Sequence, residues 1–363
     1  MTINHQLQSL LQQQMQHMVD DGTEEGMQLC VYRHGHCITD LTVGTKNDAG
    51  EPLHADDLVL VWSVSKGVTA IAMHILAERR LIDYDDPIAR YWPEFGKHGK
   101  SAITIRHVLA HTAGIPDTPE ATIEELGDWQ LMCAKVADMP LKSTPGAIPA
   151  YHGITYGWPL GEVLRRVDGR TLAQFVIDEI NQPLGIDNLF FGPPEAKLAH
   201  AARISHNMPH ITGSGTWADP AHVANHPAYQ RGLLPAANLM VNARSLARFY
   251  ASLIGDGIDG VRLLPHTRIA QATSVQRLAL DQTLGYAAAF GLGFWLGGVN
   301  NKMPPRLSAF GHPGAGGSIG YADPASDISV GFTKTRMHYV VDSHDTSRAL
   351  VKLISKHYGI IDT

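Results

Sequence analysis

The sequence predicts an α+β fold in which both ends of the chain build one antiparallel sheet and the middle forms a mainly helical insertion. Apolar and polar residues alternate at strand spacing near residues 27–43, and this alternation returns near residue 290. Helical segments joined by Pro- and Gly-rich connections lie between them. This order favours a sheet domain made of residues 1–85 together with 285–363, a helical domain of residues 86–284, and a functional site between the two.

The N-terminal part begins with an amphipathic helix and continues into a hairpin. An apolar stripe at helical spacing predicts the helix, and its members are Leu7, Leu10, Leu11, Met15, Met18 and Val19. Residues 27–31 and 38–43 then alternate on either side of the turn RHGH. A second helix is expected after Ser63, with a buried stripe formed by Val64, Val68, Ile71, Ile75 and Leu76.

The C-terminal part supplies further strands and a covering helix. The stretch LSAFGHPGAGGSIGYAD is typical of two strands joined by a Gly-rich turn, and DISVGFTKT alternates as a third strand. The last segment, DTSRALVKLISKHYG, has an apolar stripe at helical spacing, and Gly359 is well suited to a helix C-terminus.

Composition excludes several classes of function. With 363 residues, 44% hydrophobic and 18% charged, the chain is an ordinary globular protein. A net charge of −6 without a basic tract argues against nucleic acid or anionic membranes as partners. No apolar stretch reaches the ~18 residues of a spanning helix, and the N-terminus lacks the features of a signal peptide, so we expect a cytoplasmic protein. Oligomeric state is left open by the sequence.

Cysteine and histidine patterns predict neither a disulfide framework nor a metal site. Cys30, Cys37 and Cys133 form no CxxC pair, so we expect buried, reduced thiols. Histidine is plentiful at 20 residues, but no HExxH motif occurs. We therefore expect no metal and no cofactor.

A serine and a lysine three positions apart stand at the mouth of the second predicted helix. Residues i and i+3 share a helix face, so the Lys66 amine can reach the Ser63 hydroxyl. Serine is a weak nucleophile that needs a base, and burial near a positive helix end makes lysine more readily neutral. A Ser-x-x-Lys spacing also arises by chance, so a lysine reaching solvent remains the alternative.

A second serine stands in a motif of another hydrolase class. Gly316-Gly317-Ser318-Ile319-Gly320 matches Gly-x-Ser-x-Gly, the nucleophile elbow of α/β-hydrolases. That fold requires Ser318 on a strand-to-helix turn with an acid and a histidine downstream, whereas the local pattern indicates a turn between strands. We expect Ser318 to be structural or to line the pocket.

Three motifs, together with the blocks around them, resemble the serine β-lactamase and penicillin-binding-protein superfamily. They are Ser63-Val64-Ser65-Lys66, Tyr151-His152-Gly153 and His312-Pro313-Gly314, in the order and spacing of that superfamily. The sequence is most similar to the class C β-lactamase branch and its esterase relatives, the family VIII carboxylesterases, over nearly its full length. The resemblance implies a β-lactamase-like fold.

The resemblance also implies roles for individual residues. Ser63 would be the acylated nucleophile, Lys66 would lower the pKa of its hydroxyl, and Tyr151 would be a general base or proton relay, as phenolate or as a partner of Lys66. The oxyanion hole would use the backbone N–H groups of Ser63 and Ala315. Further substrate-binding candidates are His312, Gly314, Gly153 and Trp158, with Met208 as another wall residue. Structural readings remain open for Tyr151, as a half-buried tyrosine, for His312, as a wall residue, and for Trp158 and Met208, as ordinary core residues.

Two positions depart from the lactamase and peptidase pattern. The family's Asn at the third place of the tyrosine motif is Gly153 here, and the common Lys of the third motif is His312, which is mostly neutral at pH 7. Both losses argue against β-lactams and cell-wall peptides and favour a small neutral carboxylic ester. An acyltransferase, a weak β-lactamase or D-Ala peptidase, and a catalytically dead sensor or scaffold remain as alternatives.

Overall fold

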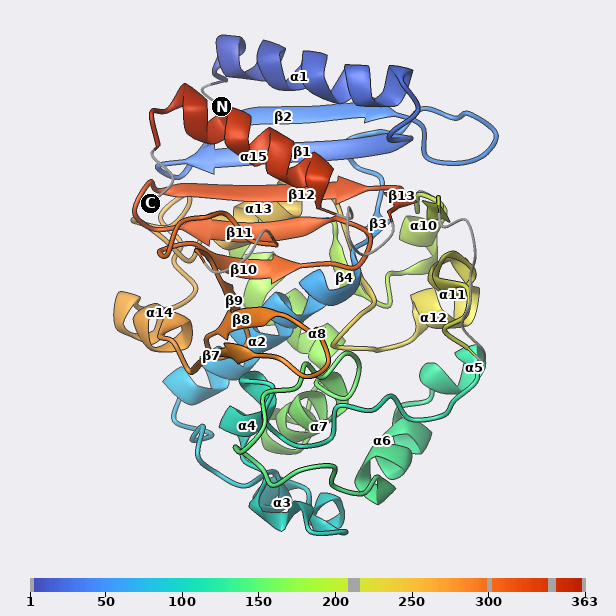
Figure 1. Ribbon diagram of the computed structural model, residues 1–363, viewed down its shortest axis with the longest axis vertical. Coiled ribbons are helices and arrows are strands. Elements are labelled where there is room, and N and C mark those ends of the chain that lie inside the picture. Colours follow the sequence, from blue (N-terminus) through green and yellow to red (C-terminus); the bar gives the residue numbers. More distant parts are fainter. Residues whose placement is uncertain (1–2, 208–215, 299–301, 339–343, 361–363) are drawn as a thin grey trace.

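The α+β fold predicted from the sequence is confirmed. The computed structural model (Figure 1) describes residues 3–207, 216–298, 302–338 and 344–360. Its main sheet has eight antiparallel strands. From one edge to the other these are β2 (His36–Gly44), β1 (Gly26–Arg33), β12 (Ile328–Lys334), β11 (Ile319–Asp323), β10 (Phe310–Pro313), β9 (Trp295–Leu296), β8 (Ala287–Phe290) and β7 (Arg277–Leu280).

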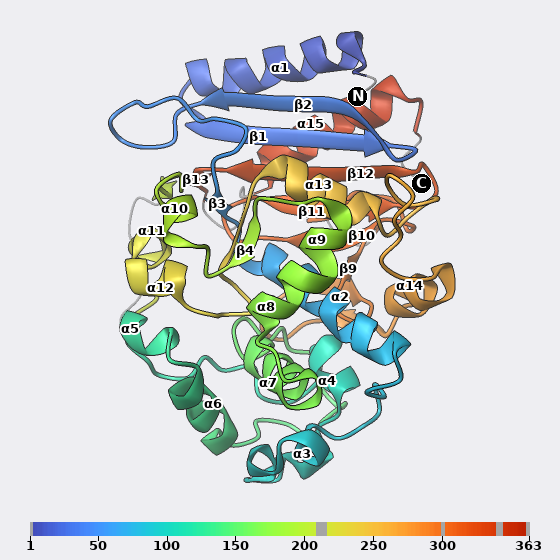
Figure 2. The same cartoon turned by 180° about the vertical axis from the view of Figure 1, so that it is seen from behind.

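The two ends of the chain meet inside this sheet. Strand β1 pairs with β12 over seven residues, from Met27 opposite Lys334 to Arg33 opposite Ile328. The terminal helices α1 (His5–Asp20) and α15 (Asp345–His357) cover one face, and α13 (Ala243–Ala251) covers the other (Figures 1 and 2). Apolar residues are therefore buried on both faces of β1.

Two elements of the sheet layer come from the range expected to be helical. Strand β7 begins at Arg277, and α13 packs directly on β12 and β1. Strand β7 was not predicted, and its apolar residues Leu278 and Leu280 point to solvent, which reverses the usual pattern of a strand on a core. The edge of the sheet is therefore built from residues that precede position 285.

The remaining elements are short. The described residues also form two small sheets. One has three strands in the order β3 (Val59–Leu60), β6 (Leu239–Val241) and β4 (Leu189–Phe191), and the other pairs β13 (Arg336–Met337) with β5 (Ser205–His206). The other helices and turns are η1 (Trp62–Val64), α2 (Ser65–Glu78), α3 (Ile88–Tyr91), η2 (Pro93–Gly96), η3 (Lys100–Ala102), α4 (Ile105–Leu109), α5 (Ile123–Leu126), α6 (Trp129–Asp138), α7 (Gly157–Asp168), α8 (Leu172–Val176), η4 (Ile177–Asn181), α9 (Gln182–Leu184), α10 (Glu195–Leu198), α11 (Pro220–Asn225), α12 (Pro227–Arg231) and α14 (His266–Thr273).

Helix α2 runs between the sheet and the helical part of the molecule (Figures 1 and 2). Every residue from Ser65 to Ala77 is buried, so the helix has no solvent-facing side along this length. It packs on α7 and α8 on one side and on β10 on the other. Its N-terminal end is thus fixed by both parts of the fold.

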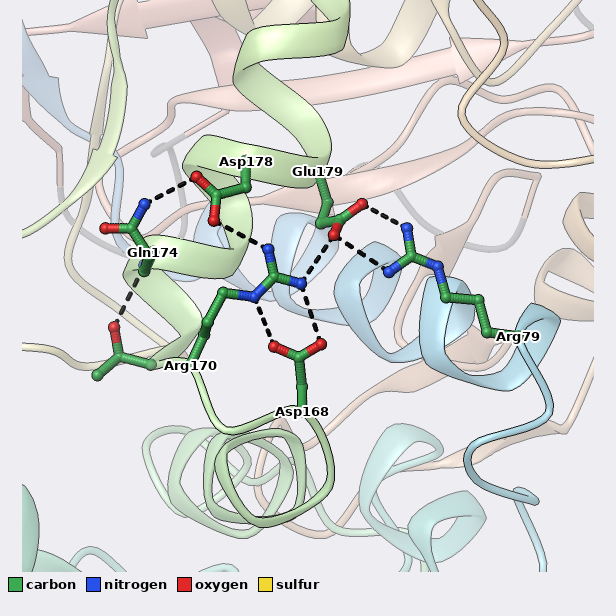
Figure 3. Close-up of polar contacts among 7 residues, drawn as sticks. Arg79, Asp168, Arg170, Gln174, Asp178 and Glu179 are labelled. Atoms are coloured by element: carbon green, nitrogen blue, oxygen red, sulfur yellow. Dashed lines mark hydrogen bonds and ion pairs between the residues drawn. The ribbon is translucent and has the colours of Figure 1, made fainter.

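An ion-pair network fixes the opposite end of α2 (Figure 3). Arg79, just after the helix, donates to Glu179, which also accepts from Arg170 at 2.7 Å. Arg170 donates further to Asp168 at 2.6 Å and to Asp178 at 2.9 Å. One guanidinium therefore joins three carboxylates and ties the α7–α8 connection to α2.

No helix among the described residues combines the length and apolarity needed to cross a membrane. The three cysteines are free and buried, as expected. The Sγ atoms of Cys30 and Cys37 lie 3.8 Å apart on neighbouring strands.

Candidate active site

Ser63 lies in a tight turn, η1, directly before α2. The preceding residue, Trp62, has a φ of 50°, a left-handed conformation that is strained for a bulky side chain. Strain of this kind persists where surrounding packing enforces it and is frequent at active sites. The Trp62 ring contacts Tyr229, with 6.0 Å between ring centroids, which helps to hold the turn.

Lys66 reaches back to Ser63 from the first turn of α2. Its Nζ lies 3.0 Å from Ser63 Oγ and donates to the carbonyl oxygens of Gly153 at 2.8 Å and Ala236 at 2.9 Å. The side chain is fully buried, so the alternative of a lysine that reaches solvent is excluded. The two carbonyl groups hold the amine beside the serine hydroxyl.

Burial changes the protonation of this amine. It lowers the pKa of Lys66 well below the usual 10.5, because the ammonium form loses its hydration. A neutral amine has two N–H donors and one lone pair. When the two N–H groups face Gly153 and Ala236, the lone pair faces the Ser63 hydroxyl. This is the arrangement required of a general base.

Tyr151 lies on the loop before α7 and contacts the same serine. Its hydroxyl shares a hydrogen bond with the Ser63 side chain, and its ring centroid is 4.9 Å from Lys66 Nζ. Burial raises the pKa of Tyr151. The hydrogen bond with Ser63 offsets this rise only in part, and the nearby Tyr286 and Asp281 raise the pKa further. These directions favour a neutral phenol. Of the two forms considered from the sequence, they favour the hydrogen-bonded partner over the phenolate.

The Gly-rich turn after β10 packs against η1. A Cβ on Gly314 would lie 2.2 Å from the Val61 carbonyl oxygen, so the two backbones touch. The next residue, Ala315, is exposed to the cavity, and no acceptor for its backbone N–H occurs among the described residues. A free N–H beside Ser63 is what an oxyanion hole requires.

These residues open into a cavity of about 320 Å³. Its walls are mainly apolar and include Leu284, Tyr286, Trp295 and Met337, together with Pro220, Pro313, Gly316, Lys302, His338 and His344. No Asp or Glu side chain is part of this lining. The cavity therefore suits a compact, largely apolar substrate.

Other predicted substrate contacts lie elsewhere. The structure favours the core reading of Trp158 over a place in the cavity wall, because the side chain is 1% exposed and packs in the core on α7, outside the cavity lining. Trp158 is the second residue of α7, and its indole is part of the core cluster. Gly153 contributes its carbonyl to Lys66 and does not line the cavity. Met208 lies outside the described residues.

His312 lies just behind the cavity wall. It is 1% exposed, and its ring centroid is 6.1 Å from that of Tyr151 and 6.0 Å from that of Trp295. The Nδ1–H donates to the Pro313 carbonyl at 2.7 Å. Burial, with the nearby Lys66, lowers the pKa of His312 well below its usual value. The residue is therefore a neutral packing partner of Tyr151 and supplies no cation to the cavity.

Ser318 does not sit on a nucleophile elbow. It is buried directly before β11, and its carbonyl accepts the N–H of Gly314 at 2.8 Å. A strand follows it where the elbow requires a helix. Ser318 supports the Gly-rich turn, in agreement with the structural role expected from the sequence.

Several contributors to the site were missed by sequence reasoning. Ala236 contributes only a backbone carbonyl, and Asp281, Leu284 and Tyr286 come from the β7–β8 hairpin, more than 120 residues after Tyr151. None of them belongs to a spaced motif. The only sequence signal was the cluster of turn-forming and apolar residues in DQTLGY.

A larger cavity of about 680 Å³ lies on the helical part, between α6 and α7. None of the motif residues lines it, so the smaller cavity beside Ser63 is the candidate active site. Within the described ranges, no group of three or more His, Cys, Asp or Glu side chains could hold a metal ion.

Comparison with known proteins gives consistent matches. The beta-lactamase family model matches residues 8–353. Esterase/beta-lactamase LipL of Mycobacterium tuberculosis is 32% identical over 344 residues, covering 86% of this chain and 77% of that protein. A penicillin-binding protein homologue from Caulobacter crescentus has a TM-score of 0.86 at 29% identity, covering 98% of both chains. A family VIII carboxylesterase has a TM-score of 0.84 at 27% identity, covering 95% of this chain and 97% of that one. The chain belongs to the beta-lactamase family.

Proposed function

We propose that the protein is a carboxylesterase that cleaves small, mainly apolar carboxylic esters through a Ser63 acyl-enzyme. The observation that carries the proposal is the buried Lys66 amine, held by two carbonyl oxygens with its third position directed at Ser63 Oγ. A catalytically dead scaffold has no use for this arrangement, because burying an amine costs free energy. Relatives named esterase or carboxylesterase support the same reading.

In the proposed acylation step, Ser63 Oγ transfers its proton to Lys66 Nζ and attacks the ester carbonyl carbon. The carbonyl oxygen becomes an oxyanion that accepts N–H groups from Ser63 and Ala315. When the tetrahedral intermediate collapses, the C–O bond to the alcohol breaks. The leaving alkoxide takes the Tyr151 proton, and Lys66 returns its proton to Tyr151.

Deacylation repeats these transfers with water. Water attacks the acyl carbon and gives its proton, through Tyr151, to Lys66. The ester bond to Ser63 then breaks, and Oγ recovers the proton. Both half-reactions leave the enzyme in its starting protonation state, so no further reactant is needed.

Substrate choice follows from the residues around the serine. The neutral His312 and the missing side chain at Gly153 leave the third motif without a cation and the tyrosine motif without an amide. Apolar walls at Leu284, Trp295 and Met337 favour a hydrocarbon acyl or alcohol group. A neutral ester therefore fits better than a β-lactam or a D-Ala peptide. A cytoplasmic location is part of the proposal, and cell fractionation tests it.

The test is hydrolysis of p-nitrophenyl esters from acetate to octanoate, with nitrocefin in parallel. Wild type should turn over esters with little nitrocefin cleavage, Ser63→Ala should be inactive, and the control Ser318→Ala should stay active. Ester turnover that survives in Ser63→Ala would overturn the nucleophile assignment. One equivalent of p-nitrophenol without turnover would instead identify an acyltransferase that lacks its acceptor.

A further inference from the structure

Asp281 is a fully buried carboxylate beside the site, and the sequence motifs do not include it. Its Oδ1 accepts three backbone N–H groups, from Tyr151 at 3.0 Å, Thr283 at 2.9 Å and Leu284 at 3.0 Å. Two of these residues belong to the turn that follows β7, and the third is the proton relay. A single oxygen atom therefore joins the catalytic loop to the cavity wall at Leu284.

The other oxygen of Asp281 is fixed by a buried arginine. Arg277 Nη2 donates to Oδ2 at 2.6 Å, and Arg277 Nε donates to the Ala110 carbonyl at 2.7 Å. The Arg277 guanidinium also lies over the Phe290 ring, 4.2 Å from its centroid. Because the guanidinium is held on three sides, the carboxylate has one available position.

The connection bears directly on both halves of the active site. A second bond, from Gln282 N to the Pro149 carbonyl at 3.0 Å, joins the same two loops beside Tyr151. Leu284 and Tyr286 of the hairpin turn line the cavity. Moving the turn would therefore shift the apolar wall and the Tyr151 backbone together.

We infer that Asp281 is a positioning residue that fixes the position of the Tyr151 hydroxyl relative to the cavity wall at Leu284. Acyl-group binding and proton transfer then depend on the same carboxylate. The inference rests on the proposed esterase function. It goes beyond that function because neither the motifs nor the reacting atoms include Asp281.

Asparagine is an informative replacement because an amide cannot satisfy both sides of the site. If its oxygen faces the three backbone N–H groups, its NH₂ group faces the Arg277 donor. If the amide is turned over, its NH₂ group faces the three backbone donors instead. Either orientation leaves buried donors facing each other, which is costly. Alanine removes all four acceptor contacts.

Asp323 offers a matched control. It is a buried aspartate that contacts Arg306 at 3.1 Å and accepts the Ala325 N–H at 3.2 Å, but it does not line the active-site cavity. Asp323→Asn creates the same kind of donor conflict away from Ser63. A loss caused only by lower stability should appear in both variants.

The experiment measures kcat, KM and the p-nitrophenol burst for acetate and octanoate esters in Asp281→Asn, Asp281→Ala and Asp323→Asn. We expect kcat to fall about tenfold in Asp281→Asn and about 100-fold in Asp281→Ala per burst-active site. The octanoate-to-acetate ratio of kcat/KM should change more than about threefold in both, because the wall moves. Asp323→Asn should keep wild-type values.

Wild-type kcat and chain-length ratio in Asp281→Asn would overturn the inference, whatever the alanine variant does and even if that variant fails to fold. Equal losses in Asp323→Asn would overturn it as well. Failure of the esterase proposal can be told apart from failure of this inference. In that case the wild-type protein would not turn over esters, or Ser63→Ala would still turn them over.

Discussion

One added methyl group at Gly314 should disable the site without replacing any of the proposed catalytic side chains. A Cβ there would lie 2.2 Å from the Val61 carbonyl oxygen and 3.2 Å from Val64 Cγ2. Ordinary contact begins at 3.4 Å, so the two backbones must separate by about 1.2 Å. One of them carries Ala315, and the other leads into Ser63. Gly314→Ala therefore separates the two proposed oxyanion donors.

The size of the effect follows from that displacement. Losing one oxyanion donor lowers kcat about 100- to 1,000-fold, or ~3–4 kcal/mol of barrier, and a misplacement near 1 Å costs about 100-fold on its own. The strain also destabilises the fold by about 1–3 kcal/mol. We therefore expect kcat/KM for p-nitrophenyl butyrate to fall at least about 100-fold, with a lower melting temperature.

Gly153→Ala is the matched control, because a Cβ on Gly153 would meet no atom within 4 Å. Its backbone carbonyl still accepts from Lys66, so activity should stay within about twofold of wild type. The assay compares steady-state hydrolysis of the two variants at a temperature where circular dichroism shows both folded. Near-wild-type activity in Gly314→Ala, or an equal loss in Gly153→Ala, would refute the reasoning.

Three further predictions follow from the charged groups. The lowered pKa of Lys66 predicts that kcat/KM falls on the acid side as the amine protonates, and Lys66→Met should lose about 100- to 10,000-fold in kcat. The wild-type protein should also gain stability relative to Lys66→Met as pH rises towards 10.5, because the lysine binds more protons in the unfolded chain than in the folded one. Denaturant titrations of both proteins across this pH range check the second result. Burial opposes ionisation of Glu162, but its hydrogen bonds, led by that from Arg165, lower its pKa to about 2. Glu162→Gln should therefore lower the free energy of unfolding by about 1–2 kcal/mol at pH 7 after solvent screening. Urea titrations should show this difference shrinking as pH falls from 4.5 to about 2. Arg170→Ala leaves three carboxylates without their shared partner, so the melting temperature should fall by about 2–4 °C while kcat is unchanged.

Local patterns in the sequence were sufficient for the fold class and for the pairing of Ser63 with Lys66. Alternation of apolar and polar residues at both ends of the chain predicted the sheet. Strands β1 and β12, which pair in the structure, each carry this alternation in their own sequence. The i,i+3 spacing predicted that the amine reaches the hydroxyl, and burial of α2 on all sides explains why that lysine stays at the site.

The cavity could not be predicted in the same way. Its walls come from residues that are distant in sequence and share no spacing, such as Leu284, Trp295 and Met337. Trp158 illustrates the converse: it lies close to Tyr151 in sequence, but α7 turns its side chain into the core. The sequence alone left both a wall and a core position open for this residue, and only the orientation of the helix decides between them.

Backbone groups explain how this chain can depart from the family motif and still hold the Lys66 amine beside Ser63. Asparagine at the third place of the tyrosine motif would offer a side-chain amide to the substrate, and Gly153 offers none. The backbone carbonyl of that residue is nevertheless present whatever the side chain, and it is this oxygen that accepts from Lys66. Ala236 acts on Lys66 in the same way, through its carbonyl. In the proposed mechanism, the side chain and the backbone carbonyl of residue 153 therefore have separate tasks, substrate recognition and positioning of Lys66. We expect that a larger polar side chain at this position, such as asparagine, would change which ester or amide is bound without removing the proposed proton transfer between Ser63 and Lys66.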